Sequence, residues 1–471
     1  MSLDAAIPHG GLEQAGSADR AGASGAEATE ALLQLARQNG SQPGQPGSFD
    51  AADVSAAGLG DRVQEAPWWD AAHEGVRLAG CTLASASLRS ANLSRANLSR
   101  ANLTGADLSR ASCHGIVLHR ARLEQARLHD ADLVGSTLSE VDAGEADFSG
   151  SLLEDAILTG ARLRFANFSG AVMDGADLSG ADLWGAKLEG IEAERARFCR
   201  ARLDEANCSG ADLAAADLTG ATLRRANLSG ARLRGAVLRD AVLDGVDLSG
   251  ADLGGAMMPH IVLASCNLHH IRIAGAWLDR TRLRAHQLGG MTGEEAAGEF
   301  EAAREGYIVL EQNFRTLGSG DDASWAFRRR RRMGKRLHLQ NARAALAART
   351  PGAALRPGLQ WMADVSAEWI CDYGESLNRV LRTFFVVLLA FAVAYWMIGA
   401  LVPREEAAVG VRFGVVDYLL FSLNSMTTVG TSEVGLKAGG QLGQLMSSIQ
   451  TVLGTVLLGL FGFVLGARMQ S

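Results

Sequence analysis

The sequence predicts a solenoid followed by a helical region that crosses a membrane. Two observations carry this prediction. A large apolar residue recurs at every fifth position from Leu78 to Leu288, and the residue two positions before it is usually Ala. Two long uncharged runs then lie near the end of the chain. A period of five fits neither a helix nor a strand, and short fixed periods are typical of solenoids.

Composition limits the class of protein further. The chain has 471 residues, a net charge of −7 and six Cys without metal-ligand spacing. This balance excludes a strongly basic nucleic-acid binder, so we expect no nucleic-acid partner, and we expect free thiols. Residues 1–70 are rich in Ala, Gly, Ser and Gln, which predicts a disordered low-complexity tail.

The repeat itself is clearest in the string ANLSRANLSRANLTGADLSR at 91–110. This string resembles the pentapeptide-repeat family, whose motif is A(D/N)LXX. The resemblance covers residues 76–290 and implies a β solenoid, a right-handed quadrilateral β-helix with four units per coil. Leu or Phe would then point inward, and the small Ala would allow each corner to close.

Charged residues test the coil length independently. At the position before each central Leu, 11 of 12 charged neighbours that are 20 residues apart have opposite signs. Opposite charges at cross-strand distance stabilise a sheet, and like charges destabilise it. The pattern therefore predicts 20 residues per coil, with Phe148 and Phe168 stacked inside. One such column reads Arg122, Asp142, Arg162, Asp182, Arg202.

The surface of the solenoid offers few specific signals. It carries 24 basic and 25 acidic residues in columns of alternating sign, which argues against an acidic, DNA-mimicking face. A structural rod and a surface for a protein partner both remain open. His260 and His270 are half a coil apart, so we expect no metal site there.

Residues 291–382 predict a cytosolic helical hairpin and juxtamembrane linker. Gly318 and Gly320 interrupt the helical pattern, and a second helix leads into the basic stretch 328–336. We expect this basic stretch to set the membrane topology and to be attracted to anionic lipid. The residues expected on one face of the first helix are Phe300, Ala303, Tyr307, Leu310, Phe314 and Leu317.

Residues 383–471 predict an all-α membrane domain with two spans, 383–403 and 445–467. Each run exceeds the roughly 20 residues that a membrane helix needs. Lys and Arg predominate just before the first span, which predicts that both termini are cytoplasmic. Tyr395 and Trp396 are expected to be anchors at the membrane interface. We expect a multi-pass protein of a bacterial inner membrane.

Between the spans lies a segment that resembles an ion-channel pore. Residues 415–426 are apolar but too short to cross a membrane, which predicts a re-entrant pore helix. The residues that follow resemble the potassium-channel signature TTVGYGD. The expected selectivity filter spans 427–433, and its residues are Thr427, Thr428, Val429, Gly430, Thr431 and Ser432, with Glu433 as an acid at the outer mouth.

This resemblance implies a homotetrameric cation channel in which backbone carbonyls replace the hydration shell of the ion. The permeant ion would be a monovalent cation, K⁺ in that family, and no bound cofactor is expected. Thr431, Ser432 and Glu433 stand where the signature has Tyr, Gly and Asp. The choice between K⁺ and Na⁺ is therefore left open.

Two further alternatives follow from the sequence. Gly454 and Gly459 in the second span fit a gating hinge, and close packing of membrane helices is the favoured alternative for each of them. The chain has no recognisable catalytic constellation, so we expect no enzyme activity. The alternative to a channel is a membrane-tethered scaffold whose solenoid binds a protein partner and whose pore domain does not conduct.

Overall fold

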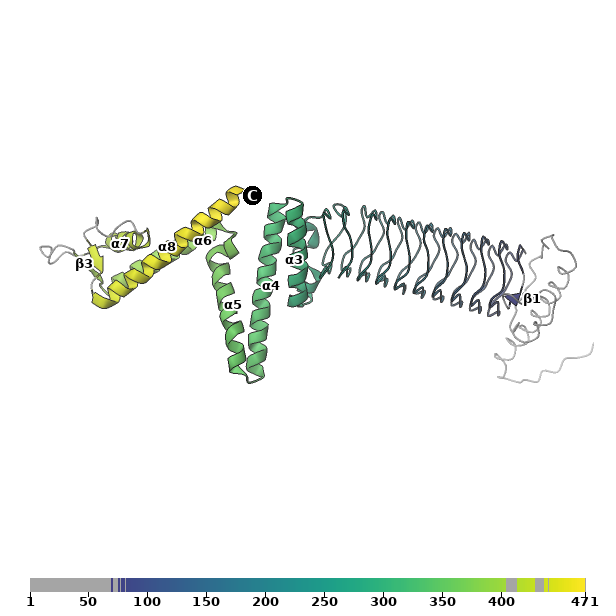
Figure 1. The fold of residues 1–471 in the computed structure, drawn as a ribbon, viewed down its shortest axis with the longest axis horizontal. Helices are drawn as coiled ribbons and strands as arrows, with labels where there is room; N and C mark the ends of the chain where they lie inside the picture. The colour runs from purple at the N-terminus through teal and green to yellow at the C-terminus, as the bar shows by residue number, and fades with distance from the viewer. Residues whose placement is uncertain are drawn as a thin grey trace, which may run out of the picture. The chain divides into compact units, whose positions relative to one another are not determined.

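The computed structural model describes residues 69–70, 75–76, 78–80, 82–403, 413–427, 436–438 and 440–470 (Figure 1). The tail predicted over residues 1–70 therefore lies almost wholly outside the described residues. The chain divides into two compact units, Met1–Ala297 and Gly298–Ser471. In the first unit, β1 (Trp69–Asp70) pairs antiparallel with β2 (Gly75–Val76) just before the repeats.

The repeat region forms a β-solenoid with 20 residues per coil (Figure 1). Its parallel bridges join residues exactly one coil apart, from Thr82 with Asn102 to Val262 with Arg282. Between neighbouring coils the Leu108 N–H donates to the Arg127 carbonyl at 2.7 Å. The coil length predicted from the charge columns is confirmed.

One unit shows how five residues make a corner. The Ala111 N–H donates to the Leu108 carbonyl at 3.0 Å, and Arg110 has a φ of 58°, as the third residue of a type II turn requires. The Asp107 carboxylate accepts the Ser109 N–H at 3.1 Å. An Asp or Asn side chain at this position therefore satisfies a backbone donor that the turn leaves free.

The interior of the solenoid is filled by the two apolar positions of each unit. The Ala and Leu residues are almost completely buried along the whole repeat, and Cys113 and Cys208 take two of the Leu positions. Burial raises the pKa of both thiols to about 12, which makes them unreactive. Phe148 and Phe168 stack with ring centroids 4.7 Å apart, as predicted.

The charge columns form ion pairs on the outside. Arg162 lies 3.3 Å from Asp142, and Arg232 lies 3.1 Å from Asp212. The arginines are largely exposed and the aspartates partly exposed, and ion pairs at a surface contribute about 0–1 kcal/mol. The columns therefore favour the correct stacking register more than they stabilise the fold.

The last coil ends in a polar cap. The short helix η1 (Ala285–Leu288) carries Gln287, whose amide donates to the Leu263 and Cys266 carbonyls. In α2 (Gly293–Ala296), one carboxylate oxygen of Glu294 accepts the Ile273 N–H at 2.6 Å. These side chains form hydrogen bonds with backbone groups that would otherwise be unpaired at the open edge of the last coil, where another chain could pair with them. Gln287 and Glu294 therefore close this end of the solenoid.

The second unit begins with three long helices. They are α3 (Phe300–Thr316), α4 (Gly320–Ala347) and α5 (Pro351–Cys371), followed by the short helix η2 (Asp372–Gly374). Pro351 stands at the start of α5, where its missing N–H costs nothing, and it separates α5 from α4. The apolar face predicted for α3 is correct, with Ala303, Tyr307, Leu310 and Phe314 fully buried.

The chain then forms α6 (Leu377–Met397), β3 (Leu401–Pro403), α7 (Val415–Thr427), β4 (Leu436–Ala438) and α8 (Gly440–Gln470). Residues Leu377–Met397 and Gly440–Gly466 are long and apolar enough to cross a membrane. The first helix begins six residues before the expected span, because Ser376 caps it by accepting the Arg379 N–H. It ends at Met397, where Gly399 takes a positive φ.

The polar cap yields a testable prediction. A Cβ at Gly293 would collide with the His270 carbonyl and lie 2.7 Å from Arg272 Cγ. We expect Gly293→Ala to lower the free energy of unfolding by about 1–3 kcal/mol, because the cap must move. Thermal unfolding followed by circular dichroism measures this loss. Gly144→Ala is the matched control, since its nearest neighbour is 3.8 Å away. Equal stability of the two variants would contradict the role of the cap.

Candidate functional site

The segment with the channel-like motif is held at both ends by a short ribbon. β3 and β4 pair antiparallel, with Leu401 opposite Ala438 and Pro403 opposite Leu436. The chain between them therefore leaves and returns at one place. That excursion contains α7, which at 13 residues is about 20 Å long and shorter than a bilayer core. α7 packs against both α6 and α8.

A buried polar network joins these three helices. The Tyr395 hydroxyl of α6 donates to Gln450 Oε1 of α8 at 2.9 Å. The Gln450 amide donates to the Ser422 carbonyl of α7 at 3.1 Å, and the Ser422 hydroxyl donates to the Leu388 carbonyl at 2.8 Å. All three side chains are fully buried. Because no water competes there, each bond favours one arrangement of the helices.

These residues were missed by sequence reasoning, and one was misplaced. Tyr395 was expected to be an interface anchor, but its side chain is buried and its ring lies edge-on to Phe421 at 5.2 Å. The sequence could have indicated this network through Gln450, because a polar residue inside a long apolar helix needs a hydrogen-bond partner. Trp396 is 61 % exposed, as an anchor would be.

A glycine brings α7 and α8 into backbone contact. A Cβ at Gly454 would collide with the Met426 carbonyl and lie 2.7 Å from Met426 Cα. Gly454 therefore packs directly against the end of α7. Gly459 has no neighbour within 4 Å of a built Cβ. The contact favours close packing for Gly454, and the hinge role of either glycine stays a prediction.

The expected filter lies at the end of α7. Thr427 is the last residue of that helix, and its hydroxyl donates to the Leu423 carbonyl at 2.9 Å. Thr428, Val429, Gly430, Thr431, Ser432 and Glu433 lie outside the described residues. Ser425, one turn before them, is buried, and its hydroxyl has no hydrogen-bond partner among the described residues.

The basic stretch of α4 faces carboxylates of α5. Arg331 donates to Asp364 and Arg332 donates to Glu368, both at 3.0 Å, and Lys335 also bonds Glu368. Burial raises the pKa of Glu368, but these cations outweigh it and hold that pKa below its ordinary value. The pairing thus loses stability as the pH falls through this lowered pKa. The stretch therefore has partners on the same chain, and its part in setting the topology and its attraction to anionic lipid stay predictions.

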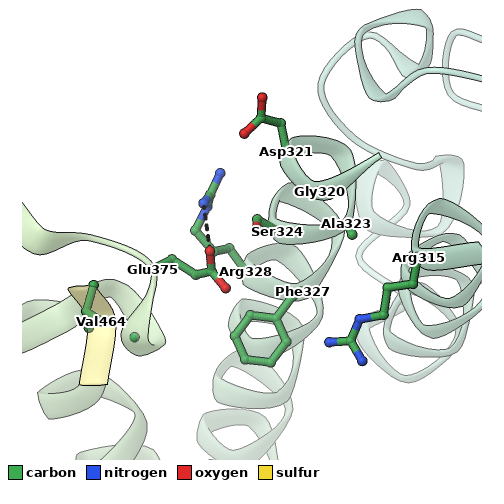
Figure 2. A pocket seen from close by; sticks show the side chains of 10 residues that line it. Arg315, Gly320, Asp321, Ala323, Ser324, Phe327, Arg328, Glu375 and Val464 are labelled. Carbon is green, nitrogen blue, oxygen red and sulfur yellow. Dashed lines mark ion pairs between the residues drawn. The ribbon is translucent and has the colours of Figure 1, made fainter. Parts of the chain in front are cut away.

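A cavity of about 890 Å³ lies where α3, α4, η2 and α8 meet (Figure 2). Arg328 and Glu375 approach each other in it at 3.9 Å, and Phe327 and Val464 form apolar parts of its wall. Positive and negative groups both line the cavity, so its charge does not favour either an anionic or a cationic ligand. Among the described residues, no group of three His, Cys, Asp or Glu side chains is arranged to hold a metal.

Comparison with known proteins identifies the first unit. The fold and its five-residue period define a β-solenoid of repeated pentapeptides. The pentapeptide-repeat family pattern matches in eight copies, over residues 74–110, 116–155, 156–192, 185–220, 194–230 and 221–258. The chain is therefore a pentapeptide-repeat protein with a helical region that holds two helices long enough to span a membrane.

Several solved structures also resemble part of this chain. HetL from the cyanobacterium Nostoc, described as involved in heterocyst differentiation regulation, is 32 % identical, with 45 % of this chain and 88 % of HetL covered and a TM-score of 0.35. QnrB1, a plasmid-mediated fluoroquinolone resistance protein, is 22 % identical, with 42 % and 95 % covered and a TM-score of 0.25. No curated protein matches the chain.

The polar network gives a second prediction. We expect Gln450→Leu to lower the stability of the detergent-solubilised protein by about 1–2 kcal/mol, because Tyr395 and Ser422 lose their shared partner. Thermal unfolding monitored by Trp fluorescence measures the change. Gln444→Leu is the control, since Gln444 is exposed on the same helix. An equal effect of both substitutions would show that the network does not hold the helices.

The glycine contact gives a third prediction. We expect Gly454→Ala to displace Met426 and with it the start of the TTVG segment, whereas Gly459→Ala has room for its methyl group. Protease accessibility of residues 428–435, read by mass spectrometry of limited digests, should rise in the first variant only. A rise in both variants, or in neither, would contradict the role of this contact.

Proposed function

We propose that the chain is a subunit of a homotetrameric cation channel with a pentapeptide-repeat domain as its interaction module. The observation that carries the proposal is the setting of α7. This helix is shorter than the hydrocarbon core of a bilayer, and Ser422 and Gln450 hold it against two long apolar helices. It ends at the TTVG sequence. Such a placement is tolerated at membrane depth where protein or a water-filled path surrounds the backbone.

Charge and surface support the same proposal. Glu433 follows the motif by three residues, and four copies would form an acidic ring that concentrates cations. Only 28 % and 22 % of the two candidate spans is buried by the chain itself. The remaining apolar surface is available to lipid and to other copies. Cations would pass the carbonyls of residues 428–431.

The role proposed for the solenoid is to receive a protein partner and to act on the pore through α3, α4 and α5. The rival function is a membrane-tethered scaffold without conduction. Exposed Phe165 and Trp277 on the solenoid suit protein binding in either case. The mass of the complex in detergent separates the two, because a filter of this type requires four chains and a scaffold does not.

Ion flux tests the proposal. Full-length protein in liposomes should conduct cations, and Glu433→Gln should reduce the flux at low salt more than at high salt, because ions screen the acidic ring. Thr428→Ala should change the order of K⁺, Na⁺ and Ca²⁺ flux. Glu301→Gln on α3 is the control and should leave the flux unchanged. Flux unchanged by both Glu433→Gln and Thr428→Ala would contradict a pore at residues 427–433.

A further inference from the structure

One side of α5 is apolar and uncovered. Leu355, Leu359, Met362 and Trp369 recur at helical spacing, and each is between 47 % and 65 % exposed. We refer to these four residues as the outer face of α5. Exposed apolar faces of this extent mark contact with a partner or with lipid.

The acidic residues of α5 lie on the other side of the helix, away from the outer face. Both of its acidic residues, Asp364 and Glu368, turn toward the basic side of α4 and are paired there. The helix has one other charged residue, Arg356, which is exposed. The exposed side of α5 therefore bears no negative charge and suits an environment that repels carboxylates, such as a bilayer surface.

Hydrogen bonds place the end of α5 beside the start of the first candidate span. Arg382 donates to the Trp369 carbonyl at 3.0 Å, and its guanidinium lies 5.5 Å from the centre of the Trp369 ring. The Thr383 hydroxyl donates to the Ile370 carbonyl at 3.3 Å. The uncharged run of α6 begins at Thr383, so Trp369 lies at the boundary between charged and apolar chain, where Trp and Arg anchors are favoured.

The direction of α5 also matters. It does not continue in line with α6, because η2 intervenes, and Figure 1 shows α5 set at an angle to α6 and α8. A helix that ends beside the start of a span, and lies at an angle to that span, can remain near the membrane surface along its length. A helix collinear with α6 would instead carry its apolar face away from the lipid.

A second helix is a poorer occupant of this face. The four apolar residues cover about two heptads, whereas a coiled coil needs three to four. Ser366 interrupts the seam, and Gly358 and Pro357 lie within the helix. Amphipathic helices that bind membranes need an apolar face that carries residues such as Trp and Leu, and they do not need the unbroken repeat of a coiled coil.

We propose that α5 is an interfacial helix whose outer face lies at the boundary of lipid headgroups and acyl chains. This inference rests on the membrane placement of α6 and α8 in the proposed function. It makes the bilayer surface itself a partner of the α4–α5 pair. The ion pairs between these two helices then keep their charges on the side facing away from the lipid.

Depth-dependent quenching tests this inference in the full-length protein. The protein is reconstituted into phosphatidylcholine–phosphatidylglycerol liposomes, with Cys81 and Cys199 replaced by Ser. A fluorophore is attached at Leu359→Cys, or at Val365→Cys on the same side of α5. Leu389→Cys on the exposed side of α6 is the lipid reference, and Glu305→Cys on α3 is the aqueous reference.

Nitroxide lipids and aqueous iodide are the two quenchers. We expect nitroxide lipid to quench the label on α5 at least about twofold more than the label on α3, with iodide giving the reverse order. Iodide quenching of the α5 label equal to that of the α3 label, while the Leu389→Cys label is quenched by lipid, would overturn this inference alone. Protection from both quenchers would also overturn it, because protein would then cover the face. No lipid quenching at Leu389→Cys would overturn the membrane placement as well.

Discussion

The arrangement of the C-terminal helices depends on the hydrogen bonds of one side chain. Gln450 is the shared partner of Tyr395 on α6 and Ser422 on α7, and it is fully buried on α8. In an apolar setting an unpaired amide would be costly, so the three helices are stable together only in this register. Gly454, one turn further along α8, then allows the end of α7 to approach the helix backbone. The position of Met426, at the end of α7, follows from these two contacts.

The solenoid obeys a different constraint, which is complete pairing of its backbone between coils. Each coil supplies donors and acceptors to the next, and the series would end in exposed groups without a cap. Gln287 and Glu294 provide that cap with side chains. The unit is therefore a self-contained rod with apolar Ala and Leu inside and alternating charges outside. Such a rod can present a large rigid surface without a conventional core.

The sequence was most informative where one local rule repeats. Coil length and the Phe148–Phe168 stack followed from the period and from the charge columns, because each unit repeats the same contacts. Sequence reasoning assigned no separate place to α5 within residues 291–382, because no period marks the turn before Pro351. Gln450 could not be assigned a role, since its partners lie on two other helices. Residues 428–433 were identified by resemblance alone, and they lie outside the described residues.

The central claim is that four chains surround a cation path lined by residues 427–433. The measurement that tests it most directly is an electron cryomicroscopy structure of the full-length protein in lipid nanodiscs. The account predicts a fourfold assembly in which the segment after α7 faces the common axis, with α6 toward lipid. A monomer or dimer, or a tetramer in which that segment faces away from the axis, would contradict it.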